Sequence, residues 1–362
     1  MTLVFCVIFI TVVFTYTNGF HDTANSIATV VSTKVLTPSQ AILLATVFNL
    51  IGALAGTAVA KTVGAGLVDT NYINMTTLLC GMMAAIAWNI LTWWVGLPSS
   101  SSHALIGGLC GAALASAHGK WSVIIWSAYQ PEKKSWEGMW HKVVVPMISS
   151  PVAGLVLGFI IMGLLMALLR NWRPLTVSKV FGKLQLASAS YMGFGHGTND
   201  AQKTMGIIAL ALMAATTRGA FDGLPAWLGF LKTPEPAAGQ PLHIAKWITV
   251  LCALTMCAGT AAGGWRIIKT LGHKMVKLHP VHGFAAETTG ATVLLVAAHF
   301  GMPVSTTHAV TTSIMGVGCA KGFNALRLRV VERILWAWVL TIPASGLVAY
   351  GLVRLARVAG WL

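Results

Sequence analysis

Long apolar stretches alternate with short polar loops along the whole chain. A helix needs about 20 apolar residues to cross the hydrocarbon core of a bilayer. The pattern predicts an all-α, polytopic membrane protein with five such segments in each half. We expect these segments at residues 3–31, 38–60, 75–95, 98–117, 143–169, 185–215, 245–264, 281–300, 303–320 and 334–357.

An odd number of segments per half has a topological consequence. The second half must enter the membrane from the opposite side, so residues 1–184 and 185–362 are predicted to form two inverted-topology repeats. The stretches at 98–117 and 303–320 begin with Pro and Ser/Thr and contain Gly. They indicate broken helices or paired re-entrant hairpins, which leaves the number of complete crossings open.

Composition supports a membrane location. Only 9% of residues are charged and 56% are apolar, whereas soluble domains average about 25% charged residues. The formal net charge is +15, and the basic residues lie in short loops. This placement indicates that they set the membrane topology and contact anionic lipid, and it argues against a groove that binds nucleic acid. The densest basic loops, 170–183 and 266–279, are assigned to the inside. We therefore expect a multi-pass protein of the cell membrane with both termini outside.

A polar motif occurs twice within these apolar stretches, at residues 17–26 and 195–204. Both copies centre on an acid, Asp22 or Asp200, and a carboxylate inside a membrane segment is a functional candidate by default. The alternative is a structural hydrogen bond between helices. Because the two acids occupy matched places in two halves, a shared site is favoured.

The residues around each acid suggest how it works. Gly19 and Gly197 stand three residues before the two acids, and we expect them to loosen the helix, which would free backbone groups for a cation and an anion. Asn25 follows Asp22 by three residues and shares its helical face. Together Asp and Asn can hold a cation and donate amide hydrogens to an oxyanion.

A second pair of polar segments begins the two suspected hairpins. GLPSSSSHALIGGLCG (96–111) and GMPVSTTHAVTTSIMG (301–316) share Gly, Pro, Ser, His, Ala and Gly at matched positions. Pro followed by hydroxyl residues is typical of a helix N-terminus, where free N–H and O–H groups can cradle phosphate. The alternative is hydroxyls that bond to their own helix. The candidate hydroxyl residues are Ser100, Ser101, Ser102, Ser305, Thr306 and Thr307.

Titratable groups are the candidates for binding a coupling ion. His103 and His308 occupy equivalent positions, and imidazole titrates near neutral pH. Glu287 also lies within an apolar segment, without an acidic counterpart near Met82; it either carries a proton or packs helices. Outside the two symmetric motifs no set of metal ligands stands out, and whether the motifs bind a metal stays open. The coupling-ion candidates are Asp22, Asp200, Asn199, His103, His308 and Glu287.

These motifs resemble the inorganic phosphate transporter (Pit) family. GFHDTANSIATVVSTKVLTP (19–38) is similar to the family's N-terminal signature, HGTNDAQKTMGIIALAL (196–212) to its C-terminal copy, and the two Pro-Ser/Thr-His segments to its paired hairpins. The resemblance spans nearly the whole chain. It implies an inverted-repeat fold, symport of phosphate with a cation, and a homodimer. The positions that match the signatures are Asp22, Asn25, Asp200 and the six hydroxyl residues above.

One residue departs from the sodium-coupled pattern. Where such a member repeats Asn after the second acid, this chain has Lys203, as the bacterial low-affinity branch does. That similarity implies proton coupling, with a metal–phosphate complex containing Mg²⁺ or another divalent metal as a candidate substrate. Hydrogen phosphate carries about two negative charges near neutral pH, so two acids beside it need neutralisation. Lys203 supplies one positive charge if it faces the site rather than snorkelling to the surface.

The sequence thus predicts a secondary active symporter of inorganic phosphate, without a resident cofactor and with H⁺ or Na⁺ as the coupling cation. A sodium-coupled symporter and a sulfate permease of the same fold stay open as alternatives. Sulfate cannot donate a hydrogen bond to a carboxylate, which favours phosphate. An anion channel would not need buried acids, and an intramembrane enzyme would rarely have a site that repeats symmetrically.

Overall fold

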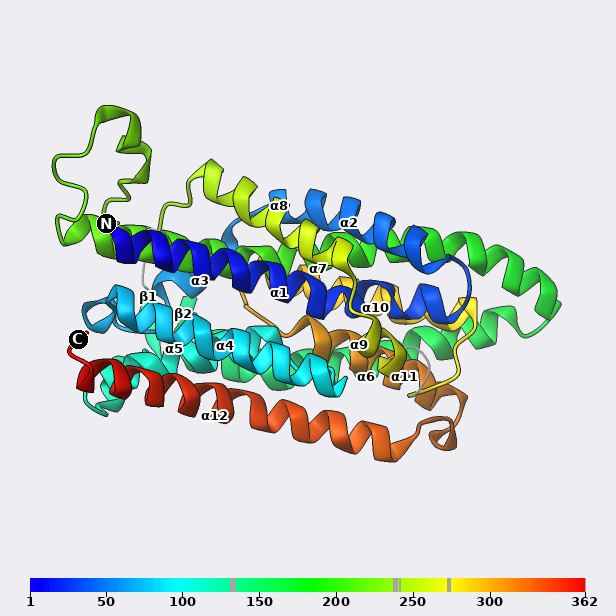
Figure 1. Ribbon diagram of the computed structural model, residues 1–362. Coiled ribbons are helices and arrows are strands. Elements are labelled where there is room, and N and C mark those ends of the chain that lie inside the picture. The colour runs from blue at the N-terminus through cyan, green and yellow to red at the C-terminus, as the bar shows by residue number, and fades with distance from the viewer. Residues whose placement is uncertain (131–134, 237–239, 241, 272–274, 362) are drawn as a thin grey trace.

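The computed structural model describes residues 1–130, 135–236, 240, 242–271 and 275–361, and most of these residues are helical (Figure 1). The loop residues Glu132, Lys133, Lys134 and Lys274 lie outside the described residues. The helices are α1 (Thr2–Ser32), α2 (Pro38–Leu54), α3 (Ala58–Ala65), α4 (Met75–Val95), α5 (Ser101–Ser116), α6 (Val145–Leu169), α7 (Pro174–Thr217), α8 (Lys246–Ala262), α9 (Trp265–Lys269), α10 (Pro280–His299), α11 (Thr306–Lys321) and α12 (Leu328–Val358). Short 3-10 or π-helical turns lie at Thr70–Tyr72, Trp121–Val123, Trp140–Val144, Ala226–Leu231 and Phe323–Ala325. The strands β1 (Ala128–Gln130) and β2 (Ser135–Glu137) pair antiparallel.

Each predicted segment corresponds to a helix, with three differences, one of which is that α12 begins at Leu328 rather than at 334. The stretch at 38–60 is a bent pair, α2 and α3, with 70° between them. Helix α7 begins at Pro174 rather than at 185, because Lys179 and Lys183 interrupt the apolar residues of its largely exposed first turns. The predicted division at 184/185 therefore falls inside α7 and stays a prediction.

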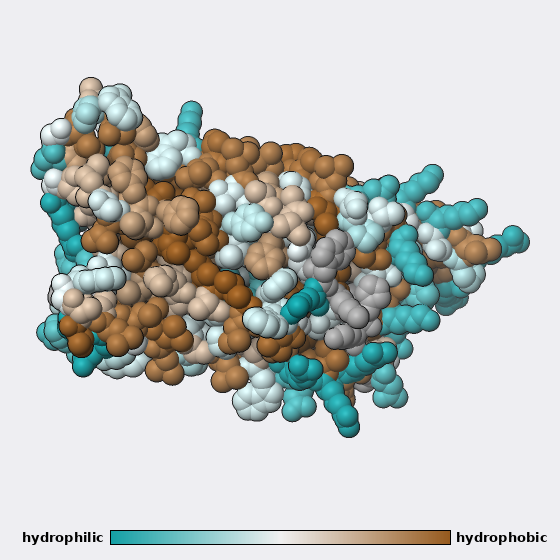
Figure 2. All heavy atoms as spheres, viewed as in Figure 1, coloured by the Kyte–Doolittle hydropathy of each residue, from teal (hydrophilic) through white to brown (hydrophobic). Residues whose placement is uncertain are grey.

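Several helices have the length and apolarity of a membrane span. Within the described ranges these number five, α1, α4, α6, α10 and α12, or six if the bent pair α2–α3 counts as one span. Helix α7 is long enough, but its mean hydropathy is lowered by the polar motif. Figure 2 shows a broad apolar belt over the middle of the molecule and hydrophilic side chains at both ends. This surface fits a bilayer wrapped around the middle of the bundle.

The helices of the two halves pack in matched pairs. Helix α1 lies against α8 as α7 lies against α2, and α5 lies against α12 as α11 lies against α6. In Figure 1, α1 runs away from the end that carries both termini, and α7 runs back toward it. Helices α6 and α12 also run in opposite directions. The second half of α1 and the second half of α7 are buried in the centre.

The expectation that Gly19 and Gly197 loosen their helices is wrong. Helices α1 and α7 continue unbroken through both positions. A Cβ atom on Gly19 would collide with the Met256 carbonyl of α8, and one on Gly197 would collide with the Asn49 carbonyl of α2. The glycines allow backbones to cross closely, which is how small residues serve helix packing in membranes.

The polypeptide does leave the helical conformation just before α5 and α11. Gly96 and Gly301 adopt left-handed φ angles of 69° and 64°, which glycine accepts without steric cost. Helices α5 and α11 each contain 16 residues, or about 24 Å at 1.5 Å per residue, short of the roughly 30 Å core of a bilayer. The first turns of both helices are buried, so both helices begin inside the molecule, which suits broken helices as well as re-entrant hairpins.

Candidate functional site

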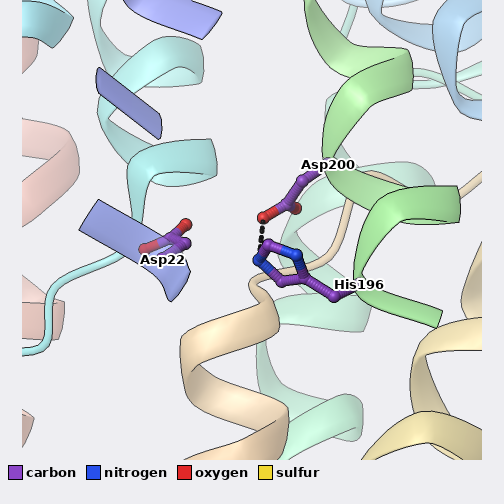
Figure 3. A group of neighbouring side chains, drawn as sticks. All are labelled: Asp22, His196 and Asp200. Carbon is purple, nitrogen blue, oxygen red and sulfur yellow. Dashed lines mark ion pairs between the residues drawn. The ribbon is translucent and has the colours of Figure 1, made fainter. Parts of the chain in front are cut away.

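Two buried carboxylates face each other near the middle of the bundle. Asp22 of α1 and Asp200 of α7 turn toward one another, with His196 of α7 beside them (Figure 3). Asp22 is 2% exposed and Asp200 is 0% exposed. One ligand atom from each of the three residues lies within 4.8 Å of the other two. Two carboxylates and an imidazole at this spacing could hold a divalent metal ion.

The half-helices α5 and α11 each direct a hydroxyl at one acid. Ser101 Oγ donates a hydrogen bond to Asp22 Oδ2 at 2.9 Å, and Thr306 Oγ1 donates to Asp200 Oδ2 at 3.0 Å. The first amides of a helix have no partner within it and carry a partial positive charge. Each acid therefore lies at a helix N-terminus that also attracts anions.

The preceding serines cap these same helices. The Ser100 and Ser305 hydroxyls accept hydrogen bonds from the His103 and His308 amides, each at 3.1 Å. This is the N-cap interaction. These two predicted binding hydroxyls are thus engaged with their own helices and lie one residue before the hydroxyls that face the acids.

Asn25 and Lys203 tie the motif helices to the half-helices. Asn25 Nδ2 donates to Thr306 Oγ1 at 3.3 Å and to Thr307 Oγ1 at 2.9 Å. The Lys203 ammonium contacts Asp200 and Ser102, and it donates to the Val304 carbonyl at 2.8 Å. Lys203 is 2% exposed, so it faces the site and does not snorkel. The structure therefore gathers every predicted binding residue into one cluster.

Two histidines stand beside the acids, and their further partners, Thr92 and Asn49, are the residues that the sequence does not point to. His21 Nδ1 lies 2.7 Å from Asp22 Oδ1, and its Nε2 lies 3.2 Å from Thr92 Oγ1. His196 Nδ1 lies 3.2 Å from Asn49 Oδ1; its Nε2 is as close to Asp200 Oδ2, but not aligned as a hydrogen bond. A lone Asn or Thr within a predicted membrane segment was the available signal.

Three further coupling-ion candidates, Asn199, His103 and His308, contact other groups than the two carboxylates. Asn199 Nδ2 donates to the Met302 carbonyl at 3.4 Å. The rings of His103 and His308 meet edge to face with centroids 4.6 Å apart, and His308 stacks on Trp338 at 3.8 Å. His103 and His308 lie in the first turns of α5 and α11.

Glu287 of α10 forms a polar cluster of its own. Its carboxylate accepts from Thr29 Oγ1 at 2.6 Å, from Gln185 Nε2 at 2.9 Å and from Ser188 Oγ at 2.5 Å. Thr29 lies two helical turns after Asp22, on the same face of α1. The cluster therefore continues the polar face of α1 away from the paired acids.

Comparison with known proteins shows which family the chain belongs to. The model of a family described as "Phosphate transporter family" matches residues 18–349. The chain belongs to this phosphate transporter family. It is accordingly a phosphate transporter and a membrane protein, and not an enzyme.

Relatives match over most of their length. Proteins described as "Probable low-affinity inorganic phosphate transporter" include one from Bacillus subtilis, 37% identical over 98% of this chain and 98% of that one, and one from Rhizobium meliloti, 41% identical over 93% and 91%. A solved structure described as "The sodium-dependent phosphate transporter" has a TM-score of 0.80 at 21% identity, covering 99% of this chain and 100% of that chain. At that identity the structure shows the shared fold alone.

Proposed function

We propose that the transporter is a proton-coupled symporter that binds inorganic phosphate between α1, α7 and the N-termini of α5 and α11. One observation carries the proposal. Each acid is matched with a hydroxyl from a half-helix N-terminus, Asp22 with Ser101 and Asp200 with Thr306. An oxyanion in this place would receive hydrogen bonds from two helix N-termini at once.

The paired acids support phosphate over sulfate. HPO₄²⁻ carries a proton that it can donate to a carboxylate, whereas SO₄²⁻ carries none. A sulfate ion beside Asp22 and Asp200 would leave acceptor facing acceptor in a low-dielectric site, which is costly. Phosphate uptake that persists in a large excess of sulfate is the expected result.

Charge balance supports coupling to protons. The dianion and two carboxylates bring about four negative charges, and Lys203 offsets one of them through its contact with Asp200. Protonation of a carboxylate or of a neighbouring imidazole would remove more. We propose that Glu287 passes the coupling proton along the polar face of α1 that includes Thr29.

We propose further that the transported substrate is a complex of phosphate with a divalent metal ion. Asp22 and Asp200 could supply carboxylate oxygens to a divalent ion such as Mg²⁺, which prefers oxygen ligands and retains several waters, whereas the imidazole of His196 suits a transition-metal ion better. The metal would then enter with phosphate as part of the substrate. Stimulation of uptake by Mg²⁺ distinguishes this form from transport of phosphate alone.

We further infer that the two halves are inverted repeats that move against each other around the bound phosphate. The matched helix pairs and the opposite directions of α1 and α7 support this. Both termini lie at one end of the molecule, so they share a side of the membrane (Figure 1). That this side is the outside, and that the protein is a homodimer, stay predictions.

The test is phosphate uptake into proteoliposomes under separately imposed proton and sodium gradients, with and without Mg²⁺. Proton coupling predicts that an inward proton gradient drives accumulation and that a protonophore abolishes it. A sodium gradient alone should have no effect. Accumulation driven by sodium alone, or equal flux without any cation gradient, would contradict the proposed mechanism.

A further inference from the structure

Lys203 is a charged side chain enclosed in the site. It is 2% exposed, and it occupies the place in the second motif that Asn25 occupies in the first, three residues after the acid. An ammonium has three hydrogens to donate. In the structure each has an oxygen acceptor: an Asp200 carboxylate oxygen, the Ser102 hydroxyl and the Val304 carbonyl.

These three oxygens come from different parts of the fold. Asp200 belongs to α7 and Ser102 to the first turn of α5, while Val304 lies in the non-helical turn before α11. A carboxylate, a hydroxyl and an unwound backbone carbonyl form the kind of donor set that binds a hard monovalent cation inside membrane transporters. The side chain of Lys203 therefore places a positive charge among three oxygen atoms that would otherwise suit a metal cation.

We propose that the Lys203 ammonium occupies an internal monovalent-cation site and serves as a tethered substitute for a mobile ion such as Na⁺. The inference rests on the proposed function, because the site adjoins the proposed phosphate position. A tethered charge cannot leave with the substrate. Each transport cycle would accordingly need one mobile cation fewer, and the chain would be insensitive to Na⁺.

The first motif shows what the same position looks like without the charge. Asn25 donates to Thr306 and Thr307, while its Oδ1 atom is buried and has no hydrogen-bond partner among the described residues. An amide at this position keeps the helix contacts and adds an oxygen. Lys203→Asn would thus remove the tethered cation and supply one more cation ligand.

The first experiment measures binding rather than transport. Purified wild type and Lys203→Asn are melted in detergent with increasing NaCl at constant ionic strength, choline being the replacement ion. The variant should show a saturable, Na⁺-dependent rise in Tm, because a ligand that binds only the folded state stabilises it. Wild type should show none. Lys179→Asn, an exposed change on the same helix with the same loss of charge, is the matched control and should behave as wild type.

The second experiment repeats these conditions with phosphate uptake into proteoliposomes. Lys203→Asn should gain stimulation by a sodium gradient, which wild type and Lys179→Asn lack. If the Asn variant does not fold, Lys203→Ala is tested with NH₄⁺, which fits the vacated oxygens and should restore thermal stability. A wild type with saturable Na⁺ dependence, or folded Lys203 variants that respond to neither cation, would overturn the inference. Absence of any phosphate uptake by wild type would instead count against the proposed function.

Discussion

The acid of the first motif and the acid of the second are built into equivalent places with different charges around them. Asp22 has His21 and Ser101 as partners, and Asn25 lies one turn away. Asp200 has Thr306 in the place of Ser101, but it also has the ammonium of Lys203.

This difference shows how one fold can take on unequal duties in its two halves. The backbone geometry is matched, down to the left-handed glycine before each half-helix. The side chains three residues after each acid are not matched. The carboxylate beside Lys203 is neutralised by the chain itself, while that of Asp22 depends on its histidine, a proton or a bound cation. We therefore expect that, beside the bound phosphate itself, the mobile charge is held by the first half.

The largest effect should come from removing the acids. Asp22→Asn and Asp200→Asn should both reduce phosphate uptake to background, but they should differ in stability. Asp200→Asn leaves a buried ammonium without its carboxylate, which costs about 3–5 kcal/mol. Asp22→Asn loses hydrogen bonds to a charged acceptor, at about 1–3 kcal/mol. Uptake and thermal unfolding of the purified variants measure both quantities.

The double variant Asp200→Asn with Lys203→Met is the control for this asymmetry. It removes the buried charge pair together, so it should recover most of the stability lost by Asp200→Asn while uptake stays at background. Equal destabilisation by the two single variants would show that the two halves do not differ in the way described.

The sequence could predict the acids and the half-helices because their signals are local. Pro98 and Pro303 followed by hydroxyl residues mark a helix start, wherever the helix later packs. A carboxylate in an apolar stretch is conspicuous in the same way. Because both signals occur once in each half, the sequence also predicts that the two acids and the two helix starts lie close together, since matched positions in two repeats meet at one interface.

Other features depend on which helices cross, and the sequence does not state that. The sequence suggests that Gly19 and Gly197 loosen their helices, but they are the points where α1 crosses α8 and α7 crosses α2. Asn49 is an isolated polar residue in an apolar stretch, and only the packing of α2 on α7 brings it to His196. Gln185 is likewise recognisable as part of a cluster only through its hydrogen bond to Glu287 on a neighbouring helix.

A smaller and more selective effect is expected at Glu287, which has Met82 at the matched position of the first half. Glu287→Gln keeps the shape and much of the hydrogen bonding but cannot carry a proton. Phosphate binding by the purified protein should persist, while stimulation of uptake by a proton gradient should be lost. Met82→Leu is the matched control and should transport normally. Undiminished proton stimulation in Glu287→Gln would remove this residue from the proposed proton route.

The smallest expected effect tests where the halves are most alike, at the caps of α5 and α11. Ser100→Ala and Ser305→Ala should each destabilise the protein by about 0.5–2 kcal/mol, the usual cost of losing an N-cap side chain. Uptake at saturating phosphate should persist, because Ser101 and Thr306 still face the acids. Ser305→Gly should cost only a few tenths of a kcal/mol, since glycine is tolerated at an N-cap. If instead the alanine variants keep their stability and lose uptake, these hydroxyls contact phosphate directly, and the assignment of capping to one serine and binding to the next residue is wrong in both halves.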